Sequence, residues 1–405
     1  MAEIIGKDIT MLPGIVAAGM ACGIKKSGEL DLALIFSRVS AVAAGMFTTN
    51  RIAAAPVQLS KQKLRRGRAQ AIIINSGNAN ACTGENGKRD CQRMAEVTAG
   101  SLGISPSLVL VSSTGIIGER LPMALIERGI QILGERIKRE DCLRGGEEVA
   151  RAIMTTDTFP KQKVVEVYLD NKKIKIGGIA KGAGMICPQL ATMLCFLVTD
   201  ATISRPMLVR SLKESVDLSF NRISIDGVTS TNDMVLILAN GLAGNEEIRR
   251  PGEAYLQFTR CLSEVTESLA RMIIQDGEGA TKFVEILVQG ARTRTDARKV
   301  AFSVANSNLV KTALYGGDPN WGRIMAAIGI SGVRVVAEKI NIQIGGVPLV
   351  FRGQKAPTSG TDLHPLFQSQ EIFLTIDLGL GNKSYRVWTC DLSPEYVHIN
   401  ACYHT

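Results

Sequence analysis

The sequence predicts an α/β or α+β fold with a smaller, strand-rich module at its C-terminal end. Apolar, strand-like runs alternate with stretches of helical periodicity between residues 71 and 274. Short strand-like segments dominate after about residue 335. At 405 residues and 45% hydrophobic, the chain can bury a large core. That length corresponds to about two or three domains.

The individual elements follow from hydrophobic periodicity and turn residues. Strands are expected at 71–75, 107–113, 163–169, 193–199 and 234–240. Helices are expected at 86–101, 122–138, 206–219 and 254–274. Pro206 suits the first turn of the third of these helices. Asp170 and Asn171 separate two alternating runs and predict a hairpin. In the C-terminal module, strands are expected at 340–346, 347–353, 371–379, 384–393 and 396–403.

Composition favours a cytoplasmic protein without a membrane segment. No run reaches the ~18 apolar residues that a helical span needs. The stretch "MLPGIVAAGMACG" is preceded by Glu3 and Asp8 and interrupted by Pro13 and Gly14, which argues against a signal peptide. The nine cysteines are odd in number and form no C-x-x-C motif, so reduced thiols are expected rather than disulfides or a zinc site.

The net charge of +9 raises nucleic acid as a partner. Basic clusters begin at Lys61 ("KQKLRRGR") and at Arg292 ("RTRTDARK"), but neither is interleaved with aromatic residues. We interpret both as solvated faces that attract anionic metabolites, and we expect no nucleic-acid partner. A basic RNA-binding or scaffolding protein is the alternative from another functional class, and salt-dependent RNA binding without enzymatic activity would indicate it.

Several common catalytic classes lack their sequence signatures. The chain has no G-x-S-x-G, H-E-x-x-H, G-x-x-x-x-G-K-[ST] or G-x-G-x-x-G motif. Its three histidines, His364, His398 and His404, all lie near the C-terminal end. A Ser-His-Asp hydrolase would need one of them to fold back. If the protein is an enzyme, its general base is therefore not expected to be a histidine.

Polar, glycine-bearing loops follow many of the predicted elements. They are "INSGNANACTG" (74–84), "VSSTGIIGE" (111–119), "IMTTDT" (153–158), "ISIDGVTSTND" (223–233), "IQDGEGATK" (274–282) and "YGGDPNWGR" (315–323). Each loop, taken alone, is explained as a turn whose side chains hydrogen-bond to the backbone of the same turn. The Ser-Ser-Thr-Gly turn after a strand can also aim a hydroxyl and an N–H at an oxyanion. Together the loops favour an enzyme.

One stretch, "KGAGMICPQLATMLCFLVTDA" from Lys181, joins a glycine-rich segment to a predicted strand through Thr192. A threonine that begins a strand is usually structural. Alternatively, cleavage just before Thr192 would give its hydroxyl a general base, the new α-amine. The α-amine has an ordinary pKa of about 7.7–8.0, which suits this role. Ala191, Gly182 and Gly184 would permit the tight backbone that self-attack needs.

The same stretch closely resembles the central signature of the ornithine acetyltransferase family, the bifunctional glutamate N-acetyltransferases of arginine biosynthesis. Further stretches match this family in the same order over nearly the whole chain. They are "INSGNANACTG", "SSTGIIGE", "IMTTDT", "SFNRISIDGVTSTND", "DGEGATK", "GGDPNWGRI" and "YVHINACYHT".

The resemblance implies a precursor that cleaves itself between Ala191 and Thr192 into chains 1–191 and 192–405. Thr192 would take acetyl from N-acetylornithine, release ornithine and pass the acetyl group to glutamate. Many members also use acetyl-CoA as a donor. The family needs no cofactor or metal, and it tends to form heterotetramers of two α and two β chains. A self-processing aminopeptidase or amidase with the same nucleophile is the closest alternative.

The resemblance also assigns residues and a fold. The oxyanion pair falls on Thr114 and Gly115. Substrate contacts fall on Thr155, Lys181, Thr192, Glu278, Asn400 and Thr405, with Thr156 and Thr158 as alternatives to Thr155. The implied fold is that of related self-processing aminopeptidases, in which helices cover two packed sheets. A catalytic domain at 1–285 would be followed by a domain at 286–405 that completes the active site.

Overall fold

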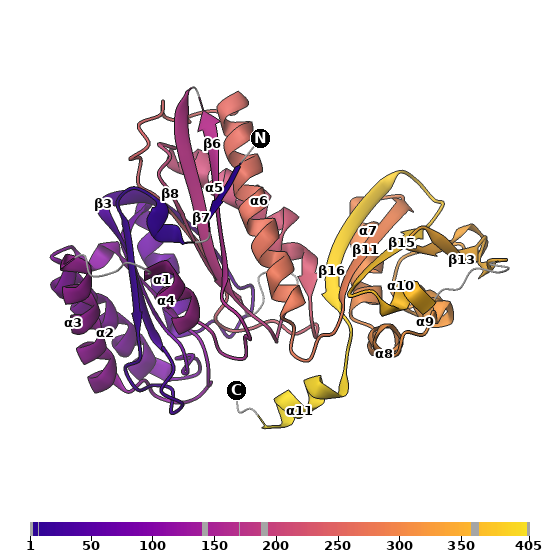
Figure 1. Ribbon diagram of the computed structural model, residues 1–405, viewed down its shortest axis with the longest axis horizontal. Coiled ribbons are helices and arrows are strands. Elements are labelled where there is room, and N and C mark those ends of the chain that lie inside the picture. The colour runs from indigo at the N-terminus through magenta and orange to yellow at the C-terminus, as the bar shows by residue number, and fades with distance from the viewer. Residues whose placement is uncertain are drawn as a thin grey trace. The chain divides into compact units, whose positions relative to one another are not determined.

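The computed structural model describes residues 3–6, 8–139, 145–169, 171–187, 193–357 and 364–402, which form two units (Figure 1). The first unit comprises Met1–Asn221 and Val228–Ile273, and the second comprises Arg222–Gly227 and Ile274–His404. The domain boundary expected between residues 285 and 286 falls inside a strand of the second unit, Phe283–Ala291.

A mixed, nine-stranded sheet forms the centre of the first unit. Its strand order is β1-β6-β7-β8-β10-β3-β4-β5, and β2 pairs with β3 off this path. The strands are β1 (Glu3–Gly6), β2 (Ile15–Met20), β3 (Leu32–Phe47), β4 (Arg68–Asn75), β5 (Val109–Ser113), β6 (Lys161–Leu169), β7 (Lys172–Lys181), β8 (Leu194–Thr199) and β10 (Met234–Ala239). The pairs β4–β5 and β8–β10 are parallel.

Helices cover this sheet and bury its apolar side chains (Figure 1). They are α1 (Ala55–Lys63), α2 (Gly84–Leu102), α3 (Met123–Lys138), α4 (Gly145–Ala152), α5 (Arg205–Leu218) and α6 (Glu253–Gln275). The apolar stripes of α2 and α3 pack against β2–β5. On β7, a Cβ at Gly178 would lie 2.9 Å from Leu269 of α6, so this glycine lets the helix approach the sheet closely.

Most of the expected elements in this unit are confirmed. The five predicted strands correspond to β4, β5, β6, β8 and β10, and the four predicted helices correspond to α2, α3, α5 and α6. The predicted hairpin is β6–β7, in which Leu169 pairs with Lys172 and Asn171 has a left-handed φ of 63°. Asparagine tolerates this conformation better than most residues do. Four further elements, β2, β3, α1 and α4, were not predicted from the sequence.

The second unit contains a seven-stranded mixed sheet in the order β14-β13-β12-β15-β11-β16-β9. Its strands are β9 (Ile223–Ser224), β11 (Phe283–Ala291), β12 (Asn341–Ile344), β13 (Val347–Phe351), β14 (Gln354–Lys355), β15 (Glu371–Asp377) and β16 (Lys383–Cys390). Its helices are α7 (Arg294–Ala305), α8 (Asn308–Gly316), α9 (Trp321–Gly329), α10 (His364–Gln368) and α11 (Pro394–Cys402). Apolar residues of α7, α8 and α9 pack on this sheet. The α/β class and the strand-rich C-terminal module are therefore confirmed.

The strand expected at 396–403 is wrong, because Pro394–Cys402 forms helix α11. Pro394 is favoured in a first helical turn, where its missing N–H has no intrahelical acceptor to lose. The alternating pattern suggested a buried face, but Val397 is 64% exposed.

Among the described residues, no helix is both long and apolar enough to span a membrane. The eight cysteines in the described part of the chain are all free thiols.

Candidate active site

Three strand ends meet at one edge of the first sheet. In register, Lys181 at the end of β7 pairs with Leu194 at the start of β8, and Leu194 pairs with Met234 at the start of β10. Met193 continues this row, since its carbonyl accepts a hydrogen bond from the Met234 N–H at 3.2 Å. The expected nucleophile, Thr192, directly precedes Met193 in the sequence and lies outside the described residues.

Lys181 brings together two hydroxyl groups that are distant in sequence. Its Nζ donates to Thr155 Oγ1 at 2.7 Å and lies 3.5 Å from Thr114 Oγ1. The lysine is only 3% exposed. Three residues that the resemblance singled out, one from each of three segments, therefore meet at one ammonium group.

Asp157 stabilises this buried cationic cluster. Its Oδ1 accepts from Lys161 Nζ and from the Gly182 N–H, both at 2.7 Å, and Oδ2 lies 3.8 Å from Lys181 Nζ. Oδ2 also accepts from the Thr155 N–H at 3.0 Å. Burial alone would raise the pKa of Asp157, but the two ammonium groups outweigh it and hold the pKa well below its usual value. The carboxylate therefore stays charged and positions both Thr155 and Lys181.

The Ser-Ser-Thr-Gly turn is held by Asn75, the last residue of β4. The Thr114 N–H donates to the Asn75 carbonyl at 3.0 Å, and Ser113 Oγ donates to Asn75 Oδ1 at 2.6 Å. Because the Thr114 N–H is engaged, its hydroxyl is the group that remains for an oxyanion. The Gly115 N–H has no hydrogen-bond partner among the residues that the structure describes.

Gly115 is required by the shape of this turn. Its φ is +129°, and a Cβ at this position would lie 2.3 Å from the Gly77 carbonyl carbon. A side chain would be both strained and in collision with backbone. The turn therefore presents one N–H and one hydroxyl side by side, as an oxyanion hole does.

The segment before β10 joins this turn to the start of β8. Asn232 Nδ2 donates to the Ser113 carbonyl at 2.9 Å and to the Ala79 carbonyl at 2.6 Å. Asp233 Oδ1 accepts from the Met193 N–H at 2.9 Å. The sequence analysis named neither residue as part of the site, nor Asp157, although "TSTND" and "TTDT" were among its polar loops.

The other expected site residues fall in two groups. Ala191, Thr192 and Thr405 lie outside the described residues. Glu278 and Asn400 belong to the second unit, where Asn400 Nδ2 donates to Glu278 Oε2 at 2.8 Å. These two side chains, 122 residues apart in sequence, therefore lie together.

Hydrogen bonds from the C-terminal segment fix the loop that carries Glu278. Asp391 Oδ1 accepts from the Thr281 N–H at 2.8 Å and from the Lys282 N–H at 3.0 Å. Ser393 Oγ donates to the Gly279 carbonyl at 2.6 Å. These hydrogen bonds hold the backbone on both sides of Glu278 in place.

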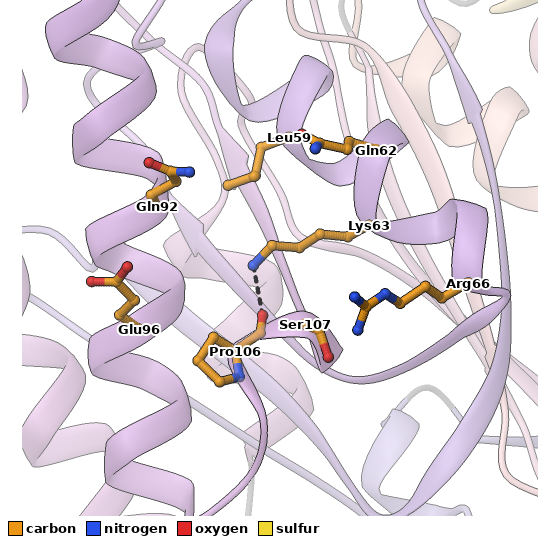
Figure 2. A pocket seen from close by; sticks show the side chains of 8 residues that line it. All are labelled: Leu59, Gln62, Lys63, Arg66, Gln92, Glu96, Pro106 and Ser107. Carbon is orange, nitrogen blue, oxygen red and sulfur yellow. Dashed lines mark hydrogen bonds between the residues drawn. The ribbon is translucent and has the colours of Figure 1, made fainter.

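A separate pocket of about 260 Å³ lies at the opposite end of β5 from Thr114 (Figure 2). It is lined by Leu59, Gln62, Lys63, Arg66, Gln92, Glu96, Pro106 and Ser107. Lys63 Nζ donates to the Pro106 carbonyl at 2.7 Å and to the Val109 carbonyl at 2.9 Å, and burial lowers the pKa of Lys63 to about 8. None of the expected site residues lines this pocket.

Comparisons with known proteins identify the family. The chain matches the ArgJ family model over residues 16–405. The arginine biosynthesis bifunctional protein ArgJ of Symbiobacterium thermophilum is 45% identical over 406 residues and is covered over 100% of both chains. The ArgJ of Bacillus subtilis is 44% identical over 399 residues, which cover 98% of this chain and 97% of the relative.

Two solved structures are also similar in sequence. ArgJ of Bacillus halodurans is 41% identical, with a TM-score of 0.49 over 50% of this chain and 96% of that chain. Ornithine acetyltransferase of Mycobacterium tuberculosis, solved in complex with ornithine, is 43% identical, with a TM-score of 0.44 over 47% of this chain and 100% of that chain. By its family match and its full-length relatives, the chain belongs to the ArgJ family and is a bifunctional acetyltransferase of arginine biosynthesis.

Proposed function

We propose that the protein transfers acetyl from N-acetylornithine to glutamate through an acetyl ester on Thr192, after cleavage between Ala191 and Thr192. The observation that carries this proposal is the contact of Lys181 with the hydroxyls of Thr155 and Thr114. This contact lies at the strand edge where Lys181 pairs with Leu194, two residues after Thr192.

The proposed chemistry uses the chain's own groups. The Thr192 α-amine would take the hydroxyl proton as Thr192 attacks the acetyl carbonyl. The Thr114 hydroxyl and the Gly115 N–H would stabilise the resulting oxyanion, and ornithine would leave as the amine. In the second half-reaction, the glutamate amine would attack the acetyl ester, and the same oxyanion hole would serve again.

Each unit carries a polar group that suits one end of an amino-acid substrate. The Lys181 ammonium would attract a substrate carboxylate, and Thr155 would orient that lysine. In the second unit, Glu278 and Asn400 would bind a substrate ammonium group and its polar neighbours. Thr192 and Thr405 complete the proposed set of substrate contacts.

Acetyl-CoA is a further proposed donor, because the chain belongs to a bifunctional family. We also propose that the cleaved chains assemble as a heterotetramer of two α and two β chains and act in the cytoplasm. The free thiols of the described cysteines support a reducing compartment. Native mass spectrometry of the purified protein would measure the assembly directly.

An assay of the purified protein with N-acetylornithine, with and without glutamate, tests the proposed reaction. We expect ornithine and N-acetylglutamate in equal amounts when glutamate is present, and no such activity from Thr192→Ala. Thr192→Ser, which keeps a hydroxyl nucleophile, should retain part of the activity. Acetate release without N-acetylglutamate would instead indicate the aminopeptidase or amidase alternative. Replacing N-acetylornithine with acetyl-CoA measures the second activity.

A further inference from the structure

Asp233 carries a buried carboxyl group beside the expected cleavage site. The residue is 1% exposed, and its Oδ1 accepts from the Met193 N–H at 2.9 Å. The backbone also holds this position, since the Asp233 carbonyl accepts from the Thr48 N–H at 3.0 Å. The carboxyl group therefore has a fixed place next to the residue that follows Thr192.

The second oxygen of this carboxyl group makes no hydrogen bond that would stabilise the fold. Asp233 Oδ2 is buried and has no hydrogen-bond partner among the residues that the structure describes. Leaving a buried polar atom unpaired destabilises a fold, and more so when the atom is charged. Anchoring Met193 needs only one acceptor, which an asparagine would also supply.

Covalent connectivity brings a reacting atom close to the nitrogen that Asp233 anchors. The Thr192 nitrogen is three bonds from the Met193 nitrogen, so the two lie within about 4 Å of each other whatever the backbone conformation. Asp233 Oδ1 is already on the Met193 N–H. The Thr192 nitrogen is the atom that departs when the bond to Ala191 breaks.

We infer that Asp233 is the proton donor to the Thr192 nitrogen during self-cleavage, acting through Oδ2 while Oδ1 anchors Met193. This inference rests on the proposed role of Thr192 as the nucleophile. The Thr192 hydroxyl oxygen bonds to the Ala191 carbonyl carbon, and the carbon–nitrogen bond breaks. The nitrogen takes the Asp233 proton, and Asp233 regains a proton from the attacking hydroxyl. Water then hydrolyses the ester and releases the Ala191 carboxyl group.

The electrostatics of the site support a protonated carboxyl group. Burial raises the pKa of Asp233 well above its usual value, although the Met193 N–H and the Lys181 charge oppose this shift. Lys181 is the charged group that acts on it, from the end of strand β7, which β8 separates from β10. Self-cleavage should therefore slow as pH rises through the raised pKa, because the donor loses its proton.

Asp233→Asn separates proton donation from anchoring, because asparagine keeps the oxygen that accepts from Met193. Asp200→Asn is the matched control. Asp200 follows the other end of β8, is also buried with a raised pKa, and accepts from the Lys175 N–H at 2.7 Å. Both variants, the wild type and Thr192→Ala are made by pulse-labelled cell-free translation, and denaturing gels follow the uncut chain over time at several pH values. Thermal unfolding confirms that each variant folds.

We expect Asp233→Asn to fold but to cleave at least about 100-fold more slowly than the wild type, with no response to the pH range in which the wild type slows. Asp200→Asn should cleave at the wild-type rate. Cleavage of folded Asp233→Asn at the wild-type rate and with the wild-type pH profile would overturn the inference alone, provided that Thr192→Ala stays uncut. Cleavage of Thr192→Ala would instead overturn the proposed function. If Asp233→Asn does not fold, Asp233→Glu, which restores a carboxyl group, must recover the pH-dependent cleavage, or the inference fails.

Discussion

At the scale of single residues, the site depends on buried charges that are fully paired. Lys181 reaches Thr155 and Thr114 because Asp157 balances both Lys181 and Lys161. Breaking a buried pair by removing one partner typically costs about 3–5 kcal/mol, since an uncompensated charge stays buried. This cluster therefore fixes the geometry of the proposed substrate site.

The proposed oxyanion hole makes a specific prediction for Thr114. Thr114→Ala should lower kcat for acetyl transfer by about 100–1,000-fold, because one donor to the oxyanion is lost. Thr114→Ser, which keeps the hydroxyl, should lose much less. Steady-state kinetics with N-acetylornithine and glutamate measures both. Equal activity of the two variants would contradict a role for the hydroxyl.

Asp200 makes a prediction about stability and pH. Burial raises its pKa to about 6, although the Lys175 N–H opposes the shift. A carboxyl group with a raised folded-state pKa contributes stability that is complete below pH about 4 and is lost as pH rises through about 6. Asp200→Asn should therefore be more stable than the wild type at pH 7, by at most about 3 kcal/mol, and similar to it at pH 4.

Urea denaturation of catalytically inactive Thr192→Ala, with and without Asp200→Asn, measures this difference on an uncut chain. A stability difference between the two that does not change from pH 4 to pH 7 would contradict the proposed titration.

Thr114, Thr155 and Lys181 could be named from the sequence, whereas Asp157 and Asp233 were not, for a physical reason. The first three stand in motifs that resemble those of the family. Asp233 acts on Met193, which lies 40 residues away, and only the pairing of β8 with β10 brings the two together. The pairing register of β8 and β10 cannot be predicted from a single sequence.

At the scale of elements, the prediction succeeded where periodicity was long and regular. The helices α2, α3, α5 and α6 were found because each repeats an apolar face over several turns. The short segment Pro394–Cys402 was mistaken for a strand. Its nine residues carry scattered apolar side chains, which fit the helical period of about 3.6 residues as well as the strand period of two. Strand β3 was missed, although small residues (Ala41, Ala43, Ala44 and Gly45) weaken the strand pattern only in its second half.

The contact of α4 with β2 supports the loop that carries Thr155 and Asp157. Gly19 of β2 lies so close to α4 that a Cβ would be 2.6 Å from the Glu148 carbonyl oxygen. The Gly19 N–H also donates to Glu148 Oε2 at 3.0 Å. Gly19→Ala should therefore destabilise the fold by about 1–3 kcal/mol, as overpacking does, and impair transfer.

Gly100→Ala is the matched control for that substitution. Gly100 lies inside α2, where an added Cβ meets nothing within 4 Å. Alanine should stabilise this helix by about 0.5–1 kcal/mol relative to glycine. Thermal unfolding of the two variants should move in opposite directions, and a Gly19→Ala protein as stable as the wild type would contradict the close packing.

At the scale of the whole molecule, the order of motifs along the chain predicted the family and therefore the function. The α/β class and the family could be predicted because eight stretches appear in the expected order. The division into units could not be read in the same way, since the second unit also takes Arg222–Gly227 from the middle of the chain. That insertion supplies β9, a short strand that pairs with β16 only in the folded protein.

The central claim is that Thr192 becomes an N-terminal nucleophile that carries the acetyl group. Intact mass spectrometry under denaturing conditions, after brief exposure to N-acetylornithine without glutamate, tests it most directly. The account predicts two chains, 1–191 and 192–405, with one acetyl group on the second chain that disappears when glutamate is added. An active protein that remains one uncut chain, or an acetyl group on chain 1–191, would contradict it.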